Sequence, residues 1–273
     1  MTTRANTELI LHNAPTRPGH EDRWPFLKTL GYTLDISVRC LWSTYRGRGG
    51  VKRCDELLDW WWRKIFTSGE ASLTVEGREH FIRGGAHVVM SNHTSLLDIP
   101  AIIGAVPGSV RMVTKQELMR VPLWGRALLA SGFIPIDRRN RERAIQQLEK
   151  AKETLATGVN VWIAPEGTRS RDGRLAPFKK GGFHTAVALG ATIIPTWIDG
   201  ASDIIPPDQL VARHGRMVTV RFGAPIPTVS RSREDLEPLM QEVRDAILAL
   251  SRGAAVATEA AQAEPAPTVA RGD

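Results

Sequence analysis

His93 and Asp98, in the stretch VVMSNHTSLLDIPAI, are the side chains whose types and spacing best suggest catalysis. Residues five apart on an α-helix point about 140° away from each other, because each residue turns the helix by about 100°. The two side chains can therefore meet only if the chain turns between them. A carboxylate that accepts the imidazole N–H fixes the tautomer and stabilises the imidazolium formed when the other ring nitrogen takes a proton. Together the pair is a candidate general base with its orienting group.

The surrounding sequence favours such a turn. Residues 88–90 are apolar and largely β-branched, which predicts a buried strand. Ser95 and Asp98 have the spacing of a capping box, and Pro100 fits only in the first turn of a helix. His93 would then lie on the loop between strand and helix. In the alternative interpretation, Asp98 only caps the helix and His93 is an ordinary loop histidine.

Basic residues follow the apolar segments of three further expected strands. Lys115 follows RMVT, Arg138 follows GFIPID, and Arg169 lies in APEGTRSRDG after VNVWI. In open α/β sheets, ligands bind beyond the carboxyl ends of the strands. A base and several cations at one edge predict a phosphorylated substrate that loses a proton. Taken alone, APEGTRSRDG would be an ordinary turn with solvated arginines.

Residues 71–252 alternate between strand-like and helix-like segments, which predicts an α/β fold, a layered sheet with flanking helices. Helices are expected over 141–158, 181–190 and 233–251, and Gly158 is expected to end the first of them. Residues 1–22 are polar, and residues 253–273 are rich in Ala, Pro and Glu, so we expect both ends to be disordered.

Residues 23–70 predict an amphipathic helical hairpin with a basic, glycine-rich turn, RGRGGVKR. Apolar stripes with helical spacing precede and follow this turn, and the second contains three consecutive tryptophans, Trp60 to Trp62. The stripes could pack on the main core, as amphipathic helices usually do. The tryptophans and the basic turn instead favour a helical hairpin that lies in a membrane interface.

Composition bounds the remaining possibilities. The 273 residues are 42% hydrophobic and carry a net charge of +7, which suits anionic partners such as acidic lipid or phosphorylated substrates. There is no secretory h-region and no run of 18 uncharged apolar residues. Cys40 and Cys54 lack the spacing of a metal or redox motif, so we expect reduced thiols in a cytosolic compartment. No Gly-x-Ser-x-Gly elbow and no nucleic-acid-binding motif occurs.

The segments NHTSLLD, TKQELMRVPLWG, GFIPIDR, APEGTRS and IIPTWI together resemble the lysophospholipid acyltransferases, typified by 1-acylglycerol-3-phosphate acyltransferase. The pattern of that family is a His-x4-Asp block, a glycine-to-Asp-Arg block, a Pro-Glu-Gly-Thr-Arg block and a final apolar strand. All four occur here in order, over roughly residues 71–225. Two departures, Pro135 and Ala164, lie in strands expected to line the site, so they bear on substrate choice.

The resemblance implies a glycerol-3-phosphate acyltransferase-like fold and a role for each matching residue. His93 would be the general base and Asp98 its orienter. The acceptor phosphate would be held by Lys115, Arg138 and Arg169, in a site shaped by Glu166 and Gly167. The hairpin over 23–70 resembles the two-helix membrane clamp of bacterial members. No metal and no cofactor is expected.

The implied reaction moves an acyl group from acyl-CoA or acyl-carrier protein to 1-acylglycerol-3-phosphate, giving phosphatidate. Alternatives are the same chemistry on another lysophospholipid, an ornithine lipid or a glycolipid, or a non-catalytic membrane-surface protein. The expected partners are the lysophospholipid, the acyl donor and an anionic membrane surface, but no nucleic acid. The expected location is peripheral and monotopic, on the cytoplasmic face of the membrane.

Overall fold

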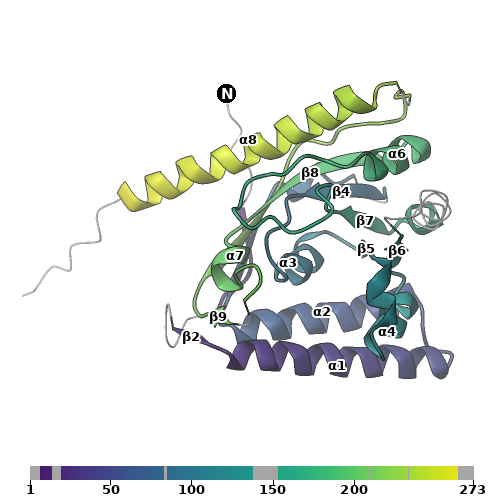
Figure 1. Cartoon of the computed structure of the whole chain (residues 1–273), viewed down its shortest axis with the longest axis vertical. Helices are drawn as coiled ribbons and strands as arrows, with labels where there is room; N and C mark the ends of the chain where they lie inside the picture. The colour runs from purple at the N-terminus through teal and green to yellow at the C-terminus, as the bar shows by residue number, and fades with distance from the viewer. Residues whose placement is uncertain are drawn as a thin grey trace, which may run out of the picture.

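The structure, a computed structural model, describes residues 7–13, 20–82, 85–137, 153–209, 211–232 and 234–263. An eight-stranded sheet forms its centre (Figure 1), in the order β1-β3-β10-β8-β4-β7-β5-β6. These strands span Thr7–Leu11 (β1), Ser72–Glu76 (β3), Met217–Phe222 (β10), Thr192–Asp199 (β8), His87–Ser91 (β4), Asn160–Ile163 (β7), Val110–Lys115 (β5) and Ile134–Ile136 (β6). The predicted α/β fold is confirmed.

The half of the sheet that includes β4 is parallel. Strand β4 pairs in parallel with β7 on one side and β8 on the other, β7 continues in parallel to β5, and β5 pairs in parallel with β6. Parallel strands bring their carboxyl ends to one edge, so the polar segments that follow them meet there. All five residues of β4 are buried, as expected for a parallel strand covered on both faces.

Helices cover both faces of the sheet. Helix α2 (Val51–Ser68) and helix α3 (Asp98–Ala105) pack on one face, where Trp62, Phe66 and Ile102 join its core. Helix α6 (Lys180–Leu189) and helix α8 (Leu236–Ala263) cover the other, where Phe183 and Leu239 are fully buried. Helix α1 (Trp24–Tyr45) lies outside α2, at the bottom of Figure 1, and also contacts α4 (Trp124–Ala130).

The predicted hairpin is present, but its two apolar stripes have different environments. The stripe of α2 is almost wholly buried against the α/β core, so the expectation that both stripes face a membrane is wrong for α2. The stripe of α1 is 49–83% exposed at its six outer positions, Leu27, Leu30, Leu34, Val38, Trp42 and Tyr45. The apolar stripe of α2 therefore packs on the core, whereas the apolar stripe of α1 stays exposed. No helix among the described residues is long and apolar enough to cross a bilayer.

The expectation of disorder at the ends of the chain is partly wrong. Strand β1 lies within the predicted N-terminal disorder and pairs antiparallel with β3, which satisfies its backbone groups and buries part of Ile10 and Leu11. Strand β2 (Glu21–Asp22) pairs with β9 (Ala212–Arg213). At the other end, α8 continues through the predicted boundary to Ala263. Residues 1–6, 14–19 and 264–273 lie outside the described residues.

The remaining sequence expectations have mixed outcomes. The helix predicted over 181–190 is α6, which ends at Gly190 with φ +58°. The segment after β5 begins with a short 3₁₀ helix, Gln116–Arg120, and continues into α4. Most of the helix predicted over 141–158 lies outside the described residues, although Gly158 has the left-handed φ of +82° expected at a helix end.

Candidate active site

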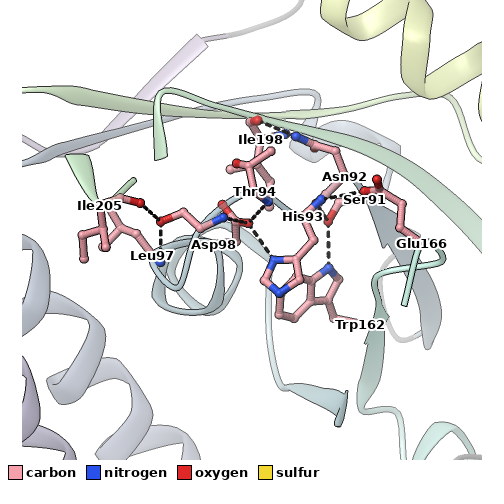
Figure 2. A network of polar contacts seen from close by, with 11 residues as sticks. Ser91, Asn92, His93, Thr94, Leu97, Asp98, Trp162, Glu166, Ile198 and Ile205 are labelled. Atoms are coloured by element: carbon pink, nitrogen blue, oxygen red, sulfur yellow. Dashed lines mark hydrogen bonds and ion pairs between the residues drawn. The ribbon is translucent and has the colours of Figure 1, made fainter. Parts of the chain in front are cut away.

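The turn between β4 and α3 brings the predicted pair together. His93 follows β4, Asp98 is the first residue of α3, and Nδ1 of His93 lies 2.7 Å from Oδ2 of Asp98 (Figure 2). The same Oδ2 accepts the backbone N–H groups of Thr94 at 2.7 Å and Ser95 at 2.9 Å. Asp98 therefore holds the turn before the helix and orients the histidine with one oxygen. The His93–Asp98 contact agrees with the base–orienter interpretation, and α3 has no side-chain cap among the described residues, so the alternative in which Asp98 only caps the helix is wrong.

The two side chains of this pair differ in their exposure to solvent. The Asp98 side chain is fully buried, whereas the His93 ring is 18% exposed at the carboxyl edge of the sheet. Three N–H groups point at Oδ2 of Asp98, so this oxygen is held in place as a hydrogen-bond acceptor for the ring. With Nδ1 donating to that carboxylate, Nε2 is the basic nitrogen of the ring. The arrangement can take a proton from a hydroxyl and stabilise the imidazolium that results.

The loop after β7 holds the backbone of His93 from both sides. Glu166 is buried, and its Oε1 accepts the His93 N–H at 3.0 Å while its Oε2 accepts the Ala176 N–H at 2.8 Å. Burial raises the pKa of the Glu166 carboxyl, and the two N–H donors partly oppose that rise. The Ser170 N–H donates to the carbonyl of His93 at 2.7 Å. Figure 2 shows Glu166 and Asp98 on opposite sides of His93.

Gly167 allows the sharp turn of this loop. Its φ is +74°, a conformation that side chains with a Cβ rarely adopt. A Cβ at this position would also lie 3.1 Å from Cδ of Lys179. The expected shaping role of Glu166 and Gly167 thus has a geometric basis.

Several residues of the site were missed by sequence reasoning. The ring of Trp162 lies edge-on to His93 at 5.8 Å, and its Nε1 donates to Oγ of Ser91 at 2.9 Å. The side-chain amide of Asn92 exchanges two hydrogen bonds with the backbone of Ile198 on β8. Oγ of Ser95 donates to the carbonyl of Ile205 at 2.8 Å. The sequence signal for Trp162 was its place in an apolar strand, which gave no sign of its neighbour.

The three predicted cations have three different outcomes. Arg169 adjoins Ser170, so it lies beside the backbone of His93, and its guanidinium is 3.7 Å from Asp208. Lys115 ends β5 on the expected edge of the sheet, but its ammonium pairs with Glu117 at 3.6 Å. Arg138 lies outside the described residues.

An apolar cavity of about 390 Å³ opens beside the turn between β4 and α3. Leu96 and Leu97, which lie between His93 and Asp98, are part of its wall. Helix α1 supplies much of the opposite wall through residues such as Leu30 and Leu34, and α4 supplies Leu128. The volume is within the usual range for ligand cavities. An apolar group bound there would end beside the His93–Asp98 pair.

Two other histidines have structural roles. His87 is buried, and both its ring Nδ1 and its backbone N–H form hydrogen bonds with Oδ1 of Asn160. Burial lowers the pKa of the His87 ring. Nδ1 of His80 lies 2.9 Å from the carbonyl of Phe222.

A histidine backed by a buried aspartate, at the carboxyl edge of a parallel sheet and next to an apolar cavity, is the arrangement expected of the His-x4-Asp acyltransferases. The family model described as Acyltransferase matches residues 72–199. A putative 1-acyl-sn-glycerol-3-phosphate acyltransferase of Caenorhabditis elegans is 31% identical over 244 residues, which cover 88% of this chain and 84% of that protein. The chain belongs to this acyltransferase family.

Three further matches agree with this assignment. The human 1-acyl-sn-glycerol-3-phosphate acyltransferase alpha is 34% identical over 179 residues, or 65% of this chain and 63% of that protein. The match to the sheep protein of that name spans 62% of its length. The crystal structure of the 1-acyl-sn-glycerophosphate acyltransferase PlsC from Thermotoga maritima superposes with a TM-score of 0.69 at 25% identity, over 89% of this chain and 95% of that one.

Proposed function

We propose that this protein transfers a fatty acyl group from acyl-CoA or acyl-carrier protein to the free hydroxyl of 1-acylglycerol-3-phosphate, giving phosphatidate. The observation that carries the proposal is the 2.7 Å contact between His93 and Asp98, beside an apolar cavity. The relatives named above supply the substrate class. Other lysophospholipids, an ornithine lipid or a glycolipid are the alternative acceptors, and a non-catalytic membrane-surface protein is the alternative class.

The acceptor hydroxyl attacks the thioester directly. Nε2 of His93 takes the hydroxyl proton as the oxygen bonds to the acyl carbon, and Asp98 stabilises the imidazolium. The tetrahedral intermediate then expels the thiolate, which takes the proton back from the imidazolium. Two serine hydroxyls near His93 support this route, because Ser91 and Ser95 donate to backbone carbonyls of Asn92 and Ile205. Neither is arranged as a nucleophile activated by the histidine.

The acceptor phosphate and an acyl chain would bind on different sides of His93. Arg169 binds the acceptor phosphate, supported by its place one residue before the Ser170 N–H that holds the His93 carbonyl. A planar guanidinium can bind two phosphate oxygens at once. Lys115 and Arg138 are proposed as further phosphate ligands on the resemblance to the family. The apolar cavity holds an acyl chain, with Leu96 and Leu97 at the end next to the base.

The exposed stripe of α1 would place the protein on a membrane as a peripheral, monotopic protein of the cytoplasmic face. Leu30, Leu34 and Trp42 would enter the interface, and Arg46 and Arg48 of the adjoining turn would meet lipid phosphates. Because α1 also forms a wall of the cavity, an acyl chain could pass from the bilayer to the site along this helix.

An assay of the purified protein with labelled acyl-CoA and acyl-carrier protein would test the proposal. The acceptor panel would contain lysophosphatidate, other lysophospholipids, a lyso-ornithine lipid and a glycolipid, with products read by mass spectrometry. We expect phosphatidate to form fastest, and to be lost with His93→Ala. A faster reaction on another acceptor would reassign the substrate, and no transfer to any acceptor would favour the non-catalytic alternative.

A further inference from the structure

The segment that follows β8 is attached to the candidate active site. Helix α7 (Ala201–Ile204) begins after β8, and Ile204 and Ile205 are buried. The carbonyl of Ile205 accepts the hydroxyl of Ser95, whose N–H in turn donates to Asp98. Figure 2 includes Ile205 beside the turn that carries Asp98. The segment that leads to the residues after Ile205 is therefore attached to the turn that carries Asp98.

Asp208, three residues further on, places its carboxylate between two arginines of the loop after β7. Oδ2 lies 2.9 Å from Nε of Arg171, and Oδ1 lies 3.7 Å from Nη2 of Arg169. The backbone φ of Asp208 is +62°, which is uncommon for a residue other than glycine, although Asp and Asn tolerate it best. One oxygen faces each guanidinium, as two oxygens of a phosphate would.

We propose that Asp208 determines the affinity of this enzyme for phosphate-bearing lipids, as an internal anion that pairs with Arg169 and Arg171 until the acceptor phosphate displaces it from Arg169. This inference rests on the proposed role of Arg169 in the acceptor site. No contact with the acceptor's acyl chain or with the acyl donor is involved.

The physical argument is competition for the same positive charges. With Asp208 ionised, the three side chains carry one net positive charge, and without it they would carry two. A phosphate must therefore replace an existing ion pair at Arg169, which weakens its binding. Lysophosphatidate and phosphatidate carry the same phosphate, so the carboxylate weakens the binding of substrate and product alike. Asp208 thus favours the release of product at the expense of affinity for the acceptor.

A purely structural role for Asp208 predicts the opposite result. If the carboxylate served only to hold Arg169 in place, its removal would disorder the guanidinium and raise the acceptor KM. The two roles can be separated by the sign of the change in KM.

The test compares Asp208→Asn with wild type in steady-state kinetics on lysophosphatidate. Asparagine keeps the size of the side chain and tolerates the left-handed backbone. Exposed ion pairs are weak, so we expect the acceptor KM and the inhibition constant of phosphatidate each to fall by about 1.5- to 5-fold. The donor KM should not change. Asp203→Asn, an exposed change of the same charge on α7, is the matched control and should alter neither value.

A double-variant cycle with Arg169→Ala tests whether the effect acts through that arginine. In the Arg169→Ala background, Asp208→Asn should no longer lower the acceptor KM. An acceptor KM that rises or stays unchanged in Asp208→Asn would overturn the inference, as would an equal fall in the Asp203→Asn control.

A binding measurement separates failure of this inference from failure of the proposed function. Inorganic phosphate should raise the Tm of Asp208→Asn more than that of wild type, whether or not the protein acylates lysophosphatidate. An absence of transfer by the wild type would refute the proposed function alone. A phosphate-dependent Tm shift that is no larger in Asp208→Asn than in wild type would refute the role of Asp208.

Discussion

Asp98→Asn is the substitution that tests the proposed base most directly. In the native site, Oδ2 of Asp98 accepts three hydrogen bonds, and within the described residues its buried Oδ1 has no hydrogen-bond partner. An asparagine can keep the three bonds with its amide oxygen, so its NH2 group would then occupy the unpartnered position. The substitution would retain the shape of the turn but remove the charge that stabilises the imidazolium.

The expected loss can be bounded from these contacts. A hydrogen bond between charged groups contributes about 1.5–3 kcal/mol, which corresponds to roughly ten- to a hundred-fold in rate if it is fully present only when the histidine is protonated. Without the carboxylate, Nδ1 is also free to lose its proton in favour of the wrong tautomer. We therefore expect kcat to fall by about 10²–10⁴-fold, the range for loss of general-base catalysis.

The assay is phosphatidate formation at saturating acyl donor and lysophosphatidate, measured beside thermal unfolding. His93→Ala should show a loss of at least the same size, and the double variant should lose little more than His93→Ala, since the two residues act as a unit. A correctly folded Asp98→Asn protein with a kcat within a few-fold of wild type would refute the base–orienter mechanism.

Three further predictions concern the surroundings of this pair. Arg169→Lys should raise the acceptor KM and Arg169→Ala should raise it about ten- to a hundred-fold in steady-state kinetics, because lysine cannot bind phosphate bidentately; a change confined to the donor KM would move Arg169 to the donor site. Leu34→Glu on α1 should weaken sedimentation with anionic vesicles by roughly ten-fold or more, whereas Gln241→Glu on α8 should not; equal binding by both variants would exclude the α1 stripe as the membrane contact. Because burial raises the Glu166 pKa, the folded state binds that proton more tightly, so its contribution to stability is present at low pH and lost as pH rises through the raised pKa. Urea unfolding of Glu166→Gln should therefore depend less on pH than that of wild type, and an unchanged pH dependence would contradict this assignment.

The strand–turn–helix around His93 could be predicted from sequence because its determinants are local. A buried apolar strand, an aspartate that accepts the N–H groups of the turn, and a proline in the first turn of the helix lie within thirteen consecutive residues, 88–100. The helical hairpin of α1 and α2 shows a feature that the local sequence does not determine. Its two stripes have the same spacing, and only the tertiary structure determines that α2 packs on the sheet while α1 does not. Strand β1 was missed for the same reason, because this five-residue segment is stabilised by pairing with β3, which lies far away in the sequence.

In the candidate site, too, some contacts could be predicted from the sequence and others could not. Contact between His93 and Asp98 was one of two interpretations of their spacing, and the structure brings them together because both lie on one turn. Trp162 reaches His93 through the register of β4 with β7, in which Val89 pairs with Trp162. Asp208 reaches Arg169 from a loop that follows β8. Such contacts depend on how distant strands align, which a single sequence does not specify.

The loop after β7 links the base to the proposed phosphate site. Glu166 and Ser170 hold the N–H and the carbonyl of His93, and Arg169 lies between them in sequence. The backbone of His93 and the backbone of Arg169 are therefore held together by the same hydrogen-bonded loop. In 1-acylglycerol-3-phosphate only a few rotatable bonds separate the phosphate from the free hydroxyl. Holding the base and Arg169 on one rigid loop would place that hydroxyl at Nε2 whenever the phosphate is bound, and this coupling converts binding of the headgroup into orientation of the reacting oxygen.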